Sequence, residues 1–108
     1  MSSGTTIDAT FCFVDIAGYT ALTHTHGESA AADLVDEFDG LVRTALGSHG
    51  QLQSLVGDCA LLVFAHPIAA LDALSALYEL VADREEFPVV RAGMHHGTAL
   101  IRADRHFG

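Results

Sequence analysis

Lysine and tryptophan are absent from this chain of 108 residues, and only two cysteines and two prolines are present. Two cysteines cannot build the disulfide framework of a small secreted protein, and without a Cys-x-x-Cys pair they do not indicate zinc. No apolar run approaches the ~20 residues that a membrane-spanning helix requires. The N-terminus also lacks the basic and apolar stretch of a signal peptide. We therefore expect a cytoplasmic protein that does not contact a membrane.

Positive charge is equally scarce. Five arginines stand against fourteen acidic residues, which gives a formal net charge of −9. Nucleic acids and anionic membranes are bound chiefly through Lys and Arg contacts to phosphate, so neither is an expected partner. If the chain binds a smaller polyanion such as a nucleotide, divalent cations must supply much of the neutralising charge.

Apolar residues make up half of the sequence, which is enough for the core of one domain. The β-branched and aromatic run TFCFVDI favours a buried strand, whereas later apolar residues repeat with the period of an amphipathic helix. A polar tail is expected at 1–9 and a single domain at 10–108. The expected elements are a strand at 10–16, a short helical turn within 17–26, a helix at 28–46, strands at 51–56 and 60–65, a helix at 67–81, a strand at 89–96 and a hairpin-like segment at 97–102.

The order of these elements, β-α-β-β-α-β, predicts a ferredoxin-like α+β sandwich. Its antiparallel sheet should carry two main helices on one face, with a C-terminal β-hairpin added. Right-handed crossovers place the third strand between the first two. The end of the first strand then lies beside the turn that joins the next two. Asp15 is at that strand end and Asp58 is in that turn, so we expect the two carboxylates to converge.

Paired aspartates at adjoining strand ends suit a two-metal site for phosphoryl or nucleotidyl transfer, because carboxylate oxygens bind Mg²⁺ and Mn²⁺. The alternative is that Asp58 is only a turn residue and Asp15 only ends a strand. For Asp15 this alternative is weaker, since a carboxylate in an apolar strand is costly without a partner.

The residues after Asp15 add a possible phosphate contact. The bend at Ile16-Ala17-Gly18 turns the Ile16 carbonyl and nearby amides outward, and glycine permits close approach of backbone to phosphate. The seven histidines give no comparable signal. His95 and His96 should point to opposite faces of a strand, and no serine lies in a G-x-S-x-G nucleophile elbow.

Together these residues resemble the catalytic domain of class III adenylate and guanylate cyclases over Thr10 to Gly108. Residues 13–20, FVDIAGYT, resemble the first metal motif of that family, and VGD at 56–58 before the strand at 61–64 resembles the second. GMHHG at 93–97 resembles the strand before the family's β-hairpin, and Phe107-Gly108 the point beyond it. The resemblance implies two Mg²⁺ or Mn²⁺ ions held by Asp15, Asp58 and the Ile16 carbonyl. It implies nucleotide or phosphate contacts from Ala17, Gly18, Tyr19, Thr20 and Gly57.

The resemblance also implies a reaction and a partner. The ribose 3′-hydroxyl of a nucleoside triphosphate would attack the α-phosphate and release pyrophosphate and a cyclic nucleotide, with ATP favoured over GTP. Family members work as head-to-tail dimers, so we expect a homodimer or a heterodimer with a fuller cyclase.

Several positions depart from the family pattern. Ser54 stands where the family usually has a base-reading lysine, and Arg105 where it has an aspartate, with Asp104 one step away. The family's final helix and strands, with an Asn and an Arg that stabilise the transition state, have no counterpart in this sequence. Three interpretations follow: a nucleotidyl cyclase, a non-catalytic cyclase-like module that binds metal and nucleotide or regulates a complete cyclase, and a generic ferredoxin-like domain whose aspartates are incidental.

Overall fold

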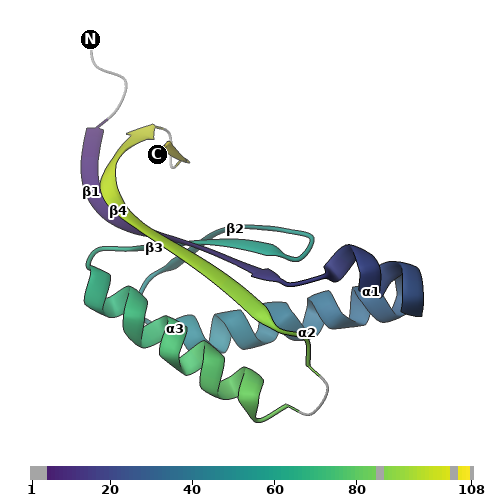
Figure 1. Cartoon of the computed structure of the whole chain (residues 1–108). Helices are drawn as coiled ribbons and strands as arrows, with labels where there is room; N and C mark the ends of the chain where they lie inside the picture. The colour runs from purple at the N-terminus through teal and green to yellow at the C-terminus, as the bar shows by residue number, and fades with distance from the viewer. Residues whose placement is uncertain (1–4, 85–86, 103–104, 108) are drawn as a thin grey trace.

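The computed structural model describes residues 5–84, 87–102 and 105–107 (Figure 1). Its elements are β1 (Thr5–Ile16), α1 (Tyr19–His26), α2 (Glu28–Leu46), β2 (Gln51–Val56), β3 (Cys59–Phe64), α3 (Pro67–Ala82), β4 (Val90–Arg102) and β5 (Arg105–Phe107). No helix in these described ranges is long and apolar enough to span a membrane.

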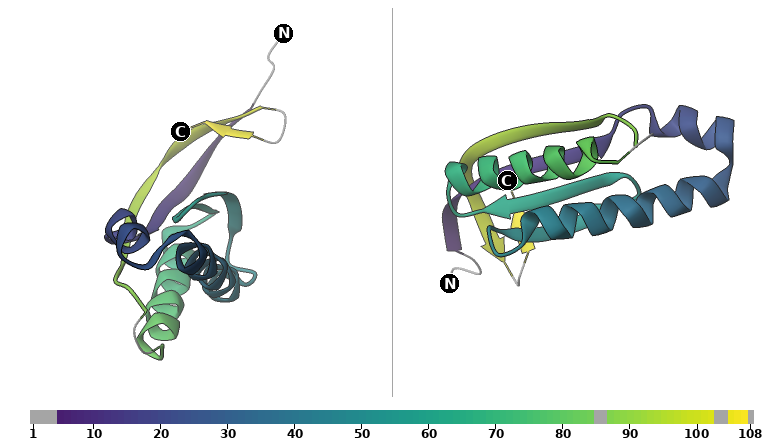
Figure 2. Two further views of the ribbon diagram at one scale, coloured as in Figure 1. Left: turned by 90° about the vertical axis from the view of Figure 1, so that its right-hand side faces the viewer. Right: turned by 90° about the horizontal axis from the view of Figure 1, so that it is seen from below.

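The sheet has the order β2-β3-β1-β4-β5, and all the neighbouring strands described are antiparallel. β3 lies between β1 and β2, as the sequence predicted. Helices α2 and α3 lie together on one side of the sheet (Figure 2). The ferredoxin-like α+β fold with two main helices on one face is therefore confirmed.

The main core lies between the helices and one face of the sheet. Alternate residues of a strand point to opposite faces, and Cys12, Val14 and Ile16 of β1 point toward the helices, where each is at most 1% exposed. Phe38 of α2 and Leu77 of α3 pack in the same cluster. Both large helices use this face, and within the described residues no helix covers the opposite face of the sheet (Figure 2). We call that opposite side the open face.

The open face carries apolar side chains of two kinds. Ala9, Phe11 and Val63 form a second, smaller buried cluster. Phe13 and Val56, nearer the other end of the strands, are 56% and 74% exposed. Large apolar side chains gathered on an uncovered face are typical of a surface that another chain covers.

Two predicted boundaries are wrong. β1 begins at Thr5, so residues 5–9 of the expected polar tail belong to the strand, where they pair with the far half of β4. The segment 97–102 is not a hairpin, because β4 continues through it to Arg102. Gly97 suggested a break, but it is paired with Ala9 inside the ladder. The C-terminal hairpin does exist, between β4 and β5.

Candidate functional site

A row of side chains crosses the open face at one end of the sheet. Asp15, near the end of β1, is paired with Arg91 of β4 on one side and with Cys59 of β3 on the other. Cys59 is paired in turn with Val56 of β2. Paired residues of antiparallel strands project to the same face, so four strands contribute one residue each to this row.

Asp58 joins the row through the β2–β3 turn. It directly precedes Cys59, and antiparallel Cα partners lie about 4.5–5.5 Å apart. Adding one Cα–Cα step of ~3.8 Å places the Asp15 and Asp58 Cα atoms within about 9 Å of each other. The pKa of the Cys59 thiol is raised first by burial and then by the charges of Asp15 and Asp58. Both carboxylates therefore act on the same small region.

The donor set at this position fits a hard divalent cation. Among the described residues, no group of three or more His, Cys, Asp or Glu side chains could hold a metal ion by itself. Mg²⁺, however, is commonly held by one or two carboxylates, with the remaining positions filled by water and substrate phosphates. Asp15 and Asp58 match that smaller requirement. Cys59 does not add a preferred ligand for Mg²⁺, because thiolates suit softer metals and carboxylate oxygens suit this hard cation.

The bend after β1 leads directly into α1. Gly18 is the N-cap of α1 and takes the left-handed conformation, with φ of 71°, which a side chain would disfavour. Ile16 is 1% exposed, so only its backbone can reach the open face. The Ala17 amide donates to the Val89 carbonyl at 2.8 Å and is already engaged. The Tyr19 hydroxyl donates to the carbonyl of Ala31 at 3.5 Å, which directs this ring toward α2.

The first turn of α1 is open to an anion. Within the described part of the chain, no side chain caps this helix. The first amides of a helix have no partner within the helix, and those of Tyr19 and Thr20 lie in that first turn. These two amides are candidate backbone donors to a phosphate oxygen.

The other predicted positions are distributed around the row. Gly57 is exposed and has φ of 58°, which suits the tight turn that carries Asp58. Ser54 is paired with Leu61 next to a β-bulge and lies on the open face, two pairs from Cys59. Arg105 is in β5, but its side chain lies outside the described residues, as does the whole of Asp104.

Arg91 joins the candidate site, although nothing in the sequence pointed to it. Its Nε donates to Oδ1 of Asp15 at 3.0 Å, and its Nη2 donates to Oδ2 at 3.2 Å. The sequence shows only an arginine near the start of the strand predicted at 89–96. Its contact with Asp15 could not be predicted until this strand was known to pair with β1.

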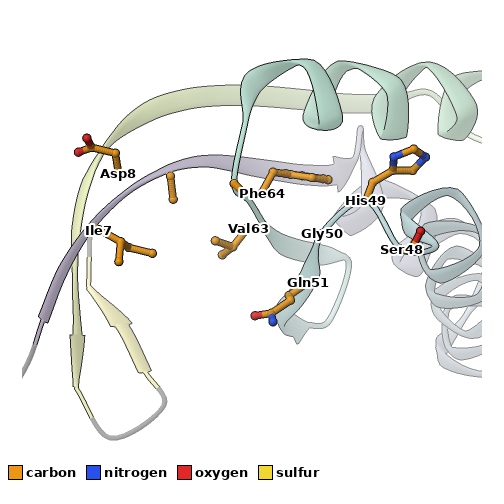
Figure 3. Close-up of a pocket in the computed structure, with 10 residues that line it drawn as sticks. Ile7, Asp8, Ser48, His49, Gly50, Gln51, Val63 and Phe64 are labelled. Atoms are coloured by element: carbon orange, nitrogen blue, oxygen red, sulfur yellow. The ribbon is translucent and has the colours of Figure 1, made fainter.

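The candidate site lies at the surface of the sheet, where the side chain of Asp15 is 34% exposed. A hollow of about 580 Å³ lies at the other end of β1, lined by Ile7, Asp8 and neighbouring residues of β3 and the α2–β2 connection (Figure 3). None of the predicted metal or phosphate residues lines it. A ligand at Asp15 and Asp58 would therefore lie on an exposed sheet surface, unless another chain covers it.

The solved structures that superpose on this chain include nucleotide cyclases. An adenylate cyclase from Trypanosoma brucei, solved in its monomeric state, superposes with a TM-score of 0.84 at 19% identity, over 94% of this chain and 63% of that one. The guanylyl cyclase Cya2 gives a TM-score of 0.74 at 17% identity, over 98% of this chain and 64% of that one. The fold of this chain is that of class III adenylyl and guanylyl cyclase domains, and the resemblance seen in its sequence is confirmed.

The sequence comparison agrees. The chain is 31% identical over 99 residues to the pH-sensitive adenylate cyclase MT1302 of Mycobacterium tuberculosis, and this match covers 92% of the chain. The chain spans 25% of that protein's length. No family model matches the sequence.

Proposed function

We propose that this chain is a nucleotidyl cyclase domain that binds ATP, and less readily GTP, through two Mg²⁺ or Mn²⁺ ions and forms a cyclic nucleotide and pyrophosphate. The observation that supports this proposal most strongly is the placement of Asp15 and Asp58 at one edge of the open face. The adenylate cyclase named among its relatives supports ATP as the substrate.

In this proposal each residue of the site has a simple task. Asp15, Asp58 and the Ile16 carbonyl hold the cations, and the amides of Tyr19 and Thr20, at the positive end of α1, bind a phosphate oxygen. Gly57 allows the turn to present Asp58. The cations, when bound, would lower the negative charge of the phosphates and activate the 3′-hydroxyl. The net charge of −9 makes that neutralisation necessary for a triphosphate to approach.

A second candidate is a non-catalytic module that binds metal and nucleotide or regulates a complete cyclase. It is favoured by the composition, because the sequence contains no lysine. The base-reading lysine of the family therefore has no equivalent among these residues, and Ser54, on the open face, cannot supply a positive charge.

Turnover separates the two candidates. The purified chain is incubated with Mn²⁺ and ATP or GTP, and cyclic nucleotide and pyrophosphate are measured by chromatography. We expect cyclic AMP from ATP and less product from GTP. In a second assay the chain is mixed with a complete cyclase whose own metal-binding aspartates have been replaced. Product would then form only if this chain supplies the missing metal ligands. Nucleotide binding that requires Mn²⁺ but yields no product in either assay would support the non-catalytic module. Absence of any Mn²⁺-dependent binding would contradict both the cyclase and the module that binds metal and nucleotide, and would leave only a regulatory role.

We further propose that the open face binds a second cyclase domain, in a homodimer or a heterodimer. Val56 is the last residue of the row, and Phe13 lies beside the row on β1; they are 74% and 56% exposed. A second chain placed there would bury this apolar surface and exclude water from the site. Coverage by a partner would also explain why the site is on a surface and not in a cavity.

Replacing Phe13 tests this surface. We expect Phe13→Glu to weaken self-association at least about tenfold, because a charged side chain at the centre of an apolar interface costs more than ~1–2 kcal/mol. Sedimentation velocity over a range of concentrations measures the change. Ile68→Glu is the matched control, since Ile68 is 72% exposed but lies on α3, in the helix layer. Equal effects of both substitutions would contradict an interface on the open face.

A further inference from the structure

Arg91 is hydrogen-bonded to the carboxylate of Asp15, which we propose as a metal ligand. Both of its hydrogen bonds go to Asp15, one to each oxygen, at 3.0 and 3.2 Å. The other ion pairs among the described residues lie on the helix layer and its connections, between Arg43 and Asp39 and between Arg84 and Glu37. Arg91 is thus the cation placed against the candidate site.

This pair and a bound cation compete for the same oxygens. A planar guanidinium that donates to both oxygens of a carboxylate occupies one lone-pair site on each of them. A divalent cation within ~2.0–2.6 Å of one oxygen would repel the guanidinium, because both are positive. Metal binding at Asp15 is therefore expected to weaken or break the two bonds to Arg91.

The surroundings allow Arg91 to move away while the strand stays in place. Val90, the preceding residue, is 4% exposed and belongs to the main core, and the Ala17–Val89 hydrogen bond holds the start of β4 against the end of β1. The Arg91 side chain, in contrast, is 67% exposed, against 34% for Asp15. It can turn toward solvent without repacking the core.

We propose that Arg91 is a positioning residue that holds Asp15 in a closed ion pair until a divalent cation displaces it, so that metal binding and release of the guanidinium are one coupled event. The proposal rests on the proposed function, since it takes Asp15 as a metal ligand. Exposed ion pairs are weak, so the closed pair should lower metal affinity by a small factor and still be displaced readily.

The coupling is visible in the arginine side-chain NMR spectrum. The chain has five arginines, so the ¹H–¹⁵N spectrum contains five Nε–H signals, and Arg91→Lys identifies one of them by its loss. On titration with Mg²⁺, we expect the Arg91 signal to shift with the same midpoint as the backbone amides of Asp15 and Cys59. The Arg43 and Arg84 signals should stay in place. An Arg91 signal that does not move while those amides report saturable binding would overturn the coupling and leave the proposed metal site standing. If those amides also fail to respond, the metal site itself is wrong, and the coupling with it.

Metal affinity gives a second measurement. We expect Arg91→Gln to bind Mn²⁺ about two- to fivefold more tightly than the unmodified chain, measured from the free Mn²⁺ signal in electron paramagnetic resonance. Arg91→Lys keeps the charge but cannot donate two hydrogen bonds to one carboxylate. Its Mn²⁺ affinity should lie between those of the unmodified chain and Arg91→Gln. Arg84→Gln removes an equal charge from the pair with Glu37 and should leave the affinity unchanged. Circular dichroism checks that each variant is folded. Equal or weaker Mn²⁺ binding by Arg91→Gln would overturn the proposal.

Discussion

Asp15→Asn is expected to weaken Mn²⁺ binding by more than about tenfold to hundredfold. That range is typical of losing a residue that only supports a metal ligand, and Asp15 is assigned as a ligand itself. The substitution keeps the size of the side chain but removes its charge, which leaves Asp58 as the single carboxylate of the site. Isothermal titration with Mn²⁺ measures the loss, and any cyclic nucleotide formation should fall with it.

The control for this substitution comes from the same strand. Asp8 also lies on β1 and accepts a hydrogen bond from Thr98 at 2.8 Å, but it points to the helix side of the sheet at the far end of the strand. Asp8→Asn changes the net charge by the same amount and should leave Mn²⁺ binding intact. If the two variants lose affinity equally, the effect comes from overall charge, and Asp15 has no special role.

Gly50→Ala is expected to destabilise the fold by about 1–3 kcal/mol, the usual range for a forced contact in a packed region. A Cβ at this position would lie 2.5 Å from Cδ1 of Phe64 and 2.6 Å from the carbonyl oxygen of Val63. Phe64 is 1% exposed and cannot turn aside, and the Val63 oxygen is backbone. Since a domain of this size has only ~5–15 kcal/mol of stability, the melting temperature should fall by roughly 5–20 °C.

Gly40→Ala is the matched comparison within the same chain. Gly40 lies inside α2, and a Cβ there would meet nothing within 4 Å. Alanine stabilises a helix interior over glycine by about 0.5–1 kcal/mol, so this variant should melt a few degrees higher. Thermal denaturation followed by circular dichroism measures both. No change at Gly50 would contradict the close packing of the α2–β2 connection against β3, and a fall in melting temperature at Gly40 would contradict the open space beside α2.

The sequence was most informative where a pattern is local. The 3.6-residue period predicted α2 and α3 within a residue or two, and the Gly57-Asp58 pair predicted the β2–β3 turn. The sheet order followed from these elements and from the handedness of the crossovers. Long-range pairing was harder to predict. The polar Thr5 and Thr6 gave no strand signal, and they are in β1 because β4 is long enough to pair with them.

The same distinction applies to the site. Asp15 and Asp58 could be found because each interrupts a recognisable pattern, an apolar strand and a tight turn. Arg91 could not, since an arginine on an exposed strand is ordinary until its partner is known. Its partner is 76 residues away. The occupied amide of Ala17 was equally hidden, because its acceptor, Val89, is far away in the sequence.

The row of Arg91, Asp15, Cys59 and Val56 is made from four strands, and no two of its members are within a single strand. The proposed ligands Asp15 and Asp58 come from β1 and from the β2–β3 turn, so their joint affinity for a cation depends on β1 and β3 being paired. A cation that binds only the assembled sheet stabilises it by mass action. A higher concentration of divalent ions would then raise the folded fraction of this acidic chain. The same ions would also serve the proposed reaction.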